Sequence, residues 1–199
     1  MDKSCPNAGY HGPKHIESLQ FLRLLRDQLA TDRGADADSM PLYLAGAVGS
    51  LFKLRLSAYG YTLVAKGVEA PNLSVLKHEK QIYGRLRAIQ GKCVPVCLGL
   101  IDLVLPYDHD GGVFTYFLLL SWAGRPLLES ISQIDKTPAK TAIAAAFTRL
   151  HQLWVLHGDA ELRNISYDAT SEGFLVIDFE HAQVHDSQPL GSISPNSQH

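Results

Sequence analysis

The chain has 199 residues, of which 46% are hydrophobic and 19% are charged. This composition predicts one domain with a packed core and excludes disorder along most of the length. The 18 Lys and Arg residues against 20 Asp and Glu residues give a formal net charge of -2. Such a balance lacks the basic excess that binding to nucleic acid needs.

Neither a membrane segment nor a disulfide framework is expected. No uninterrupted apolar run approaches the roughly 18 residues that span a bilayer, and the first residues lack the apolar stretch of a signal peptide. Cys5, Cys93 and Cys97 are an odd number of cysteines, and no second pair of ligands accompanies the last two at the spacing of a zinc site. We therefore expect an intracellular protein with reduced cysteines and with neither a nucleic-acid nor a membrane partner.

The first predicted element lies ahead of the main body of the chain. Between His15 and Leu29, apolar residues recur at intervals of three or four, which is typical of an amphipathic helix. The polar stretch Arg33–Ser39 has no large apolar side chain and is expected to be a loop. Residues 1–40 are therefore interpreted as an N-terminal extension that carries one helix, at residues 15–29. Its apolar stripe comprises Ile16, Leu19, Leu22, Leu25 and Leu29.

Residues 42–120 are predicted to form a strand-rich unit. Apolar and β-branched segments alternate here with turns that contain Gly, which favours antiparallel strands. One helix interrupts them: Pro71 and Asn72 supply a helix start, and apolar residues continue with helical period until Gly91. The five strands are expected at Leu42–Val48, Leu51–Leu56, Tyr61–Val68, Val94–Leu105 and Val113–Leu120, with a surface loop at 106–112.

The composition changes at about residue 124 toward a helical unit. Thr137 and Pro138 occupy cap and first-turn positions of a helix. Residues 121–186 are interpreted as a hinge followed by this unit, and residues 187–199, with Pro, Gly and several Ser, as a disordered tail. The fold class is therefore predicted as α+β. The apolar stripe of the long helix comprises Ile143, Ala146, Phe147, Leu150, Leu153 and Trp154.

One carboxylate is out of place in the helix that follows the third strand. Glu79 lies between Leu76 and Tyr83 inside the apolar stripe, where burial of an unpaired charge is costly. The expected partner is Lys66, the only cation of the preceding apolar strand. The alternative is a Lys that extends to water at a sheet edge and a Glu at the rim of the stripe.

Three oxygen-bearing side chains follow the long helix. Asp159 and Asn164 lie on one short segment, and Asp178 follows the apolar strand Phe174–Ile177. A hairpin can bring these segments together, and their oxygen atoms suit magnesium, which binds through one or two carboxylates and keeps positions for substrate phosphates. The alternative is that each of them is an ordinary turn residue.

Over about residues 42–185 the chain resembles the protein kinase-like superfamily. The resemblance implies a two-lobe fold, with a five-stranded antiparallel N-lobe sheet and one main helix at 42–120, and a truncated helical C-lobe at 121–186. The motifs that carry it are Lys66, Glu79, His157-Gly158-Asp159, Asn164 and Asp178-Phe179-Glu180.

The resemblance also implies roles for individual residues. Lys66 would position the phosphates of ATP and pair with Glu79, Asp159 would accept the proton of a substrate hydroxyl, and Asn164 and Asp178 would hold Mg2+. The remaining nucleotide contacts would come from Gly46 and Gly49 of an incomplete glycine loop, from Leu120 at the adenine pocket, and from the hinge residues Trp122 and Ala123.

The function implied is ATP-dependent transfer of a phosphate to a hydroxyl on a protein or a small molecule. The segments His157-Gly158-Asp159 and Ile177-Asp178-Phe179-Glu180 are also similar to those of aminoglycoside and choline phosphotransferases, and the whole resembles uncharacterised fungal kinase-like proteins. The class of substrate therefore stays open.

The sequence departs from the family pattern at four points. Gly158 replaces an Arg, which predicts that phosphorylation of an activation loop does not control the protein. Leu44 in place of the first glycine, Glu161 in place of a phosphate-contacting Lys, and the short stretch after Asp178 favour a pseudokinase, an interaction module without catalysis. The helix at 15–29 or a partner chain would then complete the C-lobe. A further alternative is that the chain is a fragment of a longer kinase.

Overall fold

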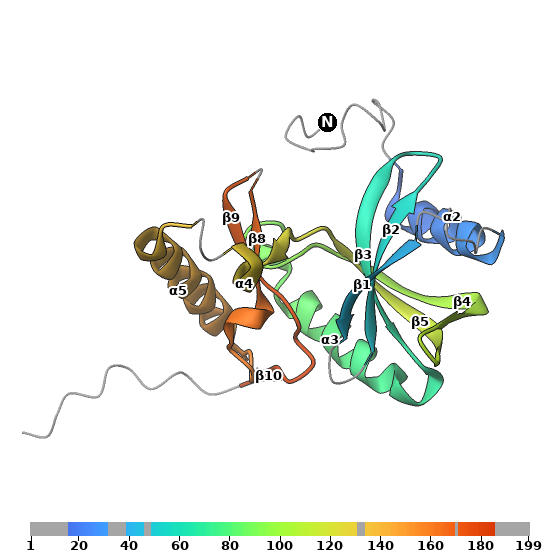
Figure 1. Cartoon of the computed structure of the whole chain (residues 1–199). Helices are drawn as coiled ribbons and strands as arrows, with labels where there is room; N and C mark the ends of the chain where they lie inside the picture. Colours follow the sequence, from blue (N-terminus) through green and yellow to red (C-terminus); the bar gives the residue numbers. More distant parts are fainter. Residues whose placement is uncertain (1–15, 32–38, 46–48, 131–133, 170, 186–199) are drawn as a thin grey trace, which may run out of the picture.

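The computed structural model describes residues 16–31, 39–45, 49–130, 134–169 and 171–185 (Figure 1). The fold is α+β, as predicted: a five-stranded antiparallel sheet is followed by a C-terminal part in which helices alternate with short strands. Among the described residues, no helix is both long and apolar enough to cross a bilayer. Most of the predicted loop Arg33–Ser39, the loop residue Gly46 and the predicted tail 187–199 lie outside these ranges.

The predicted strands are all present in one sheet, with the order β1-β2-β3-β5-β4. Every neighbouring pair is antiparallel. β1 begins before the predicted Leu42, because Ser39, Met40 and Pro41 already pair with β2. The bounds are Ser39–Ala45 for β1, Ser50–Leu56 for β2, Tyr61–Val68 for β3, Cys97–His109 for β4 and Gly112–Ser121 for β5.

The surface loop predicted at 106–112 is wrong. After a register shift that follows Asp102, β4 pairs with β5 again as far as His109, which lies opposite Gly112. Asp110 and Gly111 form the turn between the strands, with φ of 48° and 77°. Positive φ at both central residues is the conformation of a two-residue type I′ hairpin, whose twist matches that of its strands. Pairing therefore continues through a polar segment that composition alone assigned to a loop.

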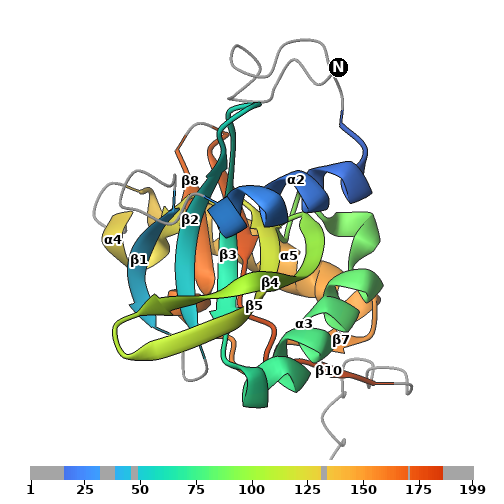
Figure 2. The ribbon, with the colours of Figure 1, turned by 90° about the vertical axis from the view of Figure 1, so that its right-hand side faces the viewer.

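Helix α2, Ser18–Thr31, lies across the outer face of the sheet (Figure 2). The predicted N-terminal helix is thus present, but its predicted apolar stripe is partly wrong, because Leu19 is 70% exposed. The buried face instead repeats at intervals of four, through Phe21, Leu25 and Leu29. These side chains belong to one apolar cluster with residues of β2, β3, β4 and β5, and α2 itself lies against β4 and β2.

Helix α3, Leu73–Arg85, packs against the opposite, inner face. It ends earlier than the predicted Gly91, and a short 3-10 turn, Arg87–Ile89, follows it. The side chain of Gln90 donates a hydrogen bond of 2.7 Å to the carbonyl of Tyr83 in the last turn of the helix, which satisfies one of the carbonyls that a helix end leaves open. The core between this helix and the sheet continues into the C-terminal part, so both parts share it.

The C-terminal part is less helical than predicted. It contains helices α4, Leu127–Ser130, and α5, Lys136–Gln152, together with two small antiparallel sheets. Strands β6, β8 and β9 form one of these sheets, and β7 and β10 form the other. The strand bounds are Arg125–Pro126 for β6, Val155–Leu156 for β7, Ile165–Asp168 for β8, Gly173–Val176 for β9 and Gln183–Val184 for β10.

The long helix α5 begins with a side-chain cap. The carboxylate of Asp135, rather than the predicted Thr137, is the cap, and it accepts a hydrogen bond of 3.1 Å from the Thr137 backbone N–H. Pro138 lies in the first turn, where its missing N–H is tolerated. Of the predicted stripe, Ala146 and Leu150 are buried and the other four residues are half-buried. The helix therefore contributes one face to the shared core.

Candidate functional site

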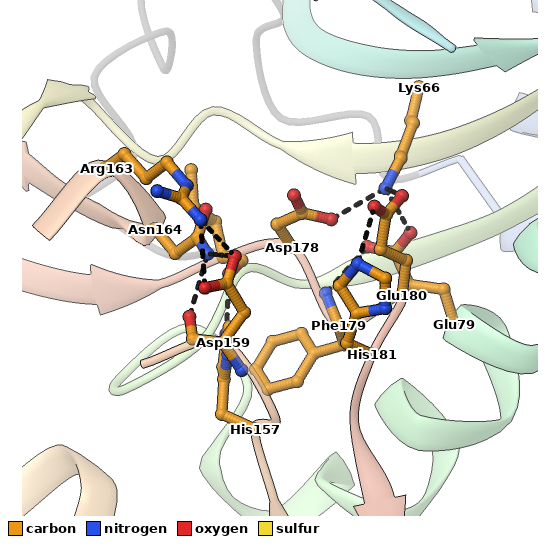
Figure 3. Close-up of polar contacts among 11 residues, drawn as sticks. Lys66, Glu79, His157, Asp159, Arg163, Asn164, Asp178, Phe179, Glu180 and His181 are labelled. Carbon is orange, nitrogen blue, oxygen red and sulfur yellow. Dashed lines mark hydrogen bonds and ion pairs between the residues drawn. The ribbon is translucent and has the colours of Figure 1, made fainter. Parts of the chain in front are cut away.

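The candidate site centres on the ammonium group of Lys66. Its Nζ atom lies 3.0 Å from Oε2 of Glu79, 2.7 Å from Oδ1 of Asp178 and 3.1 Å from Oε2 of Glu180 (Figure 3). The pairing of Lys66 with Glu79 that the sequence predicted is therefore present in the structure. The first carboxylate comes from α3 and the other two from the segment that follows β9.

Local structure explains why these groups meet. Side chains alternate between the two faces of a strand, so Lys66 shares the inner face of β3 with Val68, while Leu63 and Ala65 pack on the outer face. Glu79 lies on the buried face of α3, and its side chain is 1% exposed. A sheet face and a helix face that pack together thus bring the cation and the carboxylate into contact.

The charges of this pair affect each other's pKa. Burial alone would lower the pKa of Lys66, but the carboxylates of Glu79, Asp178 and Glu180 outweigh it and raise that pKa above its ordinary value. Burial raises the pKa of Glu79, against the opposing effect of Lys66. Lys66 is therefore a cation throughout the physiological pH range, and Glu79 depends on it for its charged form.

The segment Asp178–Glu180 turns sharply to reach this ammonium. Asp178 has a φ of 65°, a left-handed conformation that is uncommon for a residue other than Gly. The backbone N–H of Phe179 donates a hydrogen bond of 3.3 Å to Oε1 of Glu79. The Phe179 ring lies in the core between Tyr83 and His157, with ring centroids 5.2 Å and 4.9 Å away. The apolar residue thus anchors the two carboxylates on either side of it.

Asp159 and Asn164, which the sequence placed on one short segment, are in direct contact. The side-chain N–H groups of Asn164 donate hydrogen bonds of 2.8 Å to the backbone carbonyl and to Oδ2 of Asp159. The guanidinium of Arg163 donates to both carboxylate oxygens of Asp159, at 3.0 Å and 2.9 Å, and also pairs with Glu161. Hydrogen bonding to Arg163 is the main cause that lowers the pKa of Asp159. Asp159 is therefore ionised, with its lone pairs turned toward a cation.

His157 connects this loop to the strand that precedes Asp178. Its Nε2 atom lies 2.8 Å from the carbonyl of Ile177, and its Nδ1 atom accepts a weak hydrogen bond of 3.4 Å from the backbone N–H of Asp159. Burial lowers the pKa of His157, so the neutral tautomer that donates from Nε2 fits both contacts. The backbone N–H of Ile177 also donates to the carbonyl of Asn164, at 2.9 Å. The two loops are thus held side by side.

Gly158 is required by close backbone approach. Its φ is 78°, and a Cβ atom built on it would lie 2.2 Å from the carbonyl oxygen of His181. No side chain fits there without moving the segment after Asp178. The glycine at this position therefore has a local steric cause.

The residues predicted to contact a nucleotide have different environments. Leu120 and Ala123 are buried, at 6% and 8% exposure, and the exposed Trp122 ring lies 5.2 Å from Nζ of Lys53. Gly49 has a φ of 106°, and a Cβ atom there would lie 2.4 Å from the carbonyl of Gly67. Gly49 thus allows the backbone just before β2 to lie close to β3. Leu120 lies opposite Val64 of β3 in the sheet.

The predicted catalytic and metal-binding residues form two directly bonded groups. Lys66, Glu79 and Asp178 make up one, and Asp159 and Asn164 make up the other. Asp178 is the member of the first group that lies toward the second (Figure 3). They come together although their segments are far apart in the chain, because β3, α3 and the C-terminal loops border one core.

Sequence reasoning missed two charged residues of the site. Glu180 binds Lys66 directly, and Arg163 binds both oxygens of Asp159. A signal for Glu180 was available, since it lies two residues from Asp178 across the buried Phe179. A signal for Arg163 was also available, because it is the only cation between Asp159 and Asp178.

Asn164 and Asp178 each have one side-chain oxygen that the contacts described above do not use. Among the residues that the structure describes, no group of three or more His, Cys, Asp or Glu side chains could hold a metal ion. The three carboxylates near Lys66 surround its ammonium instead. Asn164 uses its amide nitrogen for Asp159 and Asp178 uses Oδ1 for Lys66, which leaves the amide oxygen and Oδ2 as hard donors. Such a pair suits an ion that also binds phosphates.

No protein-family profile matches the sequence. The chain is similar to the meiotic driver SPOK2 of Podospora anserina, with 34% identity over 191 residues. The match covers 92% of the present chain but 24% of that protein. The chain thus spans about a quarter of the length of this relative.

Proposed function

We propose that this chain is a phosphotransferase of the protein kinase-like superfamily, which transfers the γ-phosphate of Mg-ATP to a hydroxyl on a protein or small molecule. The observation that carries the proposal is the shared ammonium of Lys66, which contacts Glu79 of α3 and Asp178 of a loop 112 residues away. A buried cation held in this way is costly to maintain. It is well suited to receive the phosphates of a nucleotide.

In this proposal the five-stranded sheet with α3 is the N-lobe, and residues 121–186 are the hinge and the truncated C-lobe. The base would lie near Leu120, with the backbone of Trp122 and Ala123 beside it, and the phosphates would extend past Gly49 toward Lys66. Lys66 would bind phosphate oxygens while Glu79 keeps its ammonium in place. The similarity to part of a protein named as a meiotic driver assigns no chemistry, so the proposal rests on these residues.

The acceptor would approach Asp159, which takes the proton of its hydroxyl. Because both oxygens of Asp159 bind Arg163, a productive complex requires Arg163 to release at least one of them. Asn164 and Asp178 would hold magnesium, which neutralises charge on the phosphates when bound. Asn164 has a second task, since its amide donates to Asp159 and orients the carboxylate.

A pseudokinase is the second candidate, and it has an observation of its own. Lys66 and Asp159 are both paired with oppositely charged side chains of the chain, so neither of them needs a nucleotide as its partner. A scaffold that never binds nucleotide would keep these pairs for stability. The two candidates differ in whether Mg-ATP stabilises the protein and whether phosphate is transferred.

The first test is the melting temperature of the purified chain with ATP, with and without magnesium. A ligand at 100 times its dissociation constant stabilises by about 2.7 kcal/mol, and each kcal/mol raises the melting temperature of a chain of this size by about 2–4 °C. We expect a magnesium-dependent rise that Asp178→Asn removes and Asp108→Asn retains, because Asp108 is exposed on β4. A cooperatively folded chain with no rise would exclude the nucleotide site.

The second test separates an enzyme from a nucleotide-binding scaffold. With a panel of proteins and small alcohols as acceptors and labelled ATP, we expect phosphate transfer that Asp159→Asn abolishes. The same variant should keep the magnesium-dependent rise in melting temperature, since Asp159 does not contact Lys66. Transfer that survives Asp159→Asn would contradict its role as the base, and binding without any transfer would favour the pseudokinase.

A further inference from the structure

Glu180 adds a third carboxylate to an ammonium that already has two. Its side chain is 5% exposed, with Oε2 at 3.1 Å from Nζ of Lys66 and Oε1 at 3.3 Å from Nε2 of the exposed His181 (Figure 3). Burial of a carboxylate is costly, and Lys66 has a more deeply buried partner in Glu79. Glu180 is therefore not needed to neutralise Lys66, and its presence calls for another reason.

The ammonium is crowded by carboxylates, since oxygens of Glu79, Asp178 and Glu180 lie 3.0, 2.7 and 3.1 Å from Nζ. An ammonium carries three N–H donors; Asp178 and Glu180 accept hydrogen bonds from Lys66, and Glu79 lies in ion-pair contact. A phosphate oxygen that binds the ammonium would lie beside these carboxylate oxygens. Because carboxylates outnumber the cation, the site repels a bare polyphosphate.

A divalent cation changes this balance. Asp178 is the most exposed of the three carboxylates, with a side chain that is 29% exposed, and it is the one next to Asn164 and Asp159 (Figure 3). A cation held by Oδ2 of Asp178, the oxygen that Lys66 does not use, would offset part of the excess negative charge around the ammonium. Among the described residues, the ion-pair partners of Glu180 are Lys66 and the exposed His181. Glu180 therefore continues to interact mainly with Lys66.

We propose that Glu180 is a specificity-determining residue that makes nucleotide binding at this site depend on a divalent cation. The carboxylate of Glu180 next to Lys66 lowers the affinity of the site for metal-free polyphosphate and has little effect on its affinity for the metal complex. This inference rests on the proposed nucleotide site and adds to it a distinct property, the selection of the metal complex over the free nucleotide. Binding, not turnover, is the measured quantity.

The test is the dissociation constant of ATP, measured by calorimetry in EDTA and in excess magnesium. The wild-type chain should bind the magnesium complex at least about tenfold more tightly than free ATP, a factor equal to 1.4 kcal/mol. In Glu180→Gln, free ATP should bind about tenfold more tightly than in the wild type, with the magnesium complex changed by less than about threefold. Glu180→Asp retains the charge and should retain the preference.

Glu172→Gln is the matched control, since it removes the same charge from the exposed turn between β8 and β9. Glu180→Ala serves as a second neutral variant, and far-UV circular dichroism checks that each variant is folded. If the wild type binds free ATP as tightly as the magnesium complex, the inference is wrong and the nucleotide site stands. The same conclusion follows if the neutral variants keep the wild-type preference. If no form binds either species, the nucleotide site itself is wrong and the inference falls with it.

Discussion

Removal of the Lys66 ammonium by Lys66→Ala should destabilise the chain more than any exposed charge substitution. It leaves Glu79, whose side chain is 1% exposed, without its cation, and removing one partner of a buried pair costs about 3–5 kcal/mol. Glu79→Gln should cost less, because Lys66 keeps Asp178 and Glu180 as partners. Against a typical unfolding free energy of about 5–15 kcal/mol, the first loss is large enough to measure directly.

The pH dependence of this loss has a defined sign. The pKa of Glu79 is raised in the folded state from its ordinary 4.5, so its protonated form favours folding, and stability falls as pH rises through the raised pKa. Without Lys66, which lowers this pKa, the pKa of Glu79 rises further. The defect of Lys66→Ala should therefore be greater at pH 8 than at pH 5, because the lower pH favours the neutral form of Glu79 in the folded variant.

Urea denaturation at both pH values, followed by circular dichroism, measures these losses. Lys92→Ala is the control, since Lys92 is exposed in a turn and should change stability by less than about 0.5 kcal/mol. The double variant Lys66→Ala, Glu79→Gln should recover part of the loss, as expected for residues in contact. A loss under about 1 kcal/mol, the scale of exposed ion pairs, or an equal loss at both pH values would refute the reasoning.

Three further outcomes are expected from the site loops. In urea denaturation, Gly158→Ala should lose about 1–3 kcal/mol more stability than Gly111→Ala. The two glycines have φ of 78° and 77°, but only a Cβ atom at Gly158 would lie against a backbone oxygen. Equal losses would contradict the steric cause. In an NMR titration, Arg163→Ala should raise the pKa of Asp159 toward its ordinary value, because hydrogen bonding to Arg163 is what lowers this pKa most. An unchanged pKa would show that Arg163 does not bind the carboxylate in solution. Burial lowers the pKa of His157, so the unfolded chain binds a proton at this residue more readily than the folded chain. The free energy of unfolding should therefore fall as pH drops below about 6.5. A His157→Gln variant whose stability falls equally steeply with pH would contradict this.

Periodicity made the main elements of the fold predictable. The alternation in Tyr61–Val68 matches β3 as observed, and the helical spacing around Glu79 matches the buried face of α3. The contact between Lys66 and Glu79 was also predictable, because a charge in an apolar pattern requires a partner of opposite sign. Burial patterns are local properties of the chain. For Lys66 and Glu79 they left open a Lys at a sheet edge and a Glu at the rim of the stripe, and the remaining motif residues favoured the pair.

The tight turn between β4 and β5 and the short strands of the C-terminal part were harder to predict. Composition around Asp110 and Gly111 is that of a loop, but two positive φ values make it a tight turn between paired strands. Strands of two to four residues, such as β7 and β8, are too short to show a period. Whether such segments become strands depends on the partner that supplies their hydrogen bonds, which lies elsewhere in the chain.

The amino-acid pattern alone showed which side chains need partners, and with the family resemblance it predicted a site of Lys66, Glu79, Asp159, Asn164 and Asp178. That Glu180 binds Lys66 and Arg163 binds Asp159 follows from the three-dimensional arrangement. The reason is that a one-dimensional pattern records whether a residue is polar or apolar. The direction in which a loop carboxylate or guanidinium points depends on backbone conformations, such as the positive φ of Asp178, that are set by packing between distant segments.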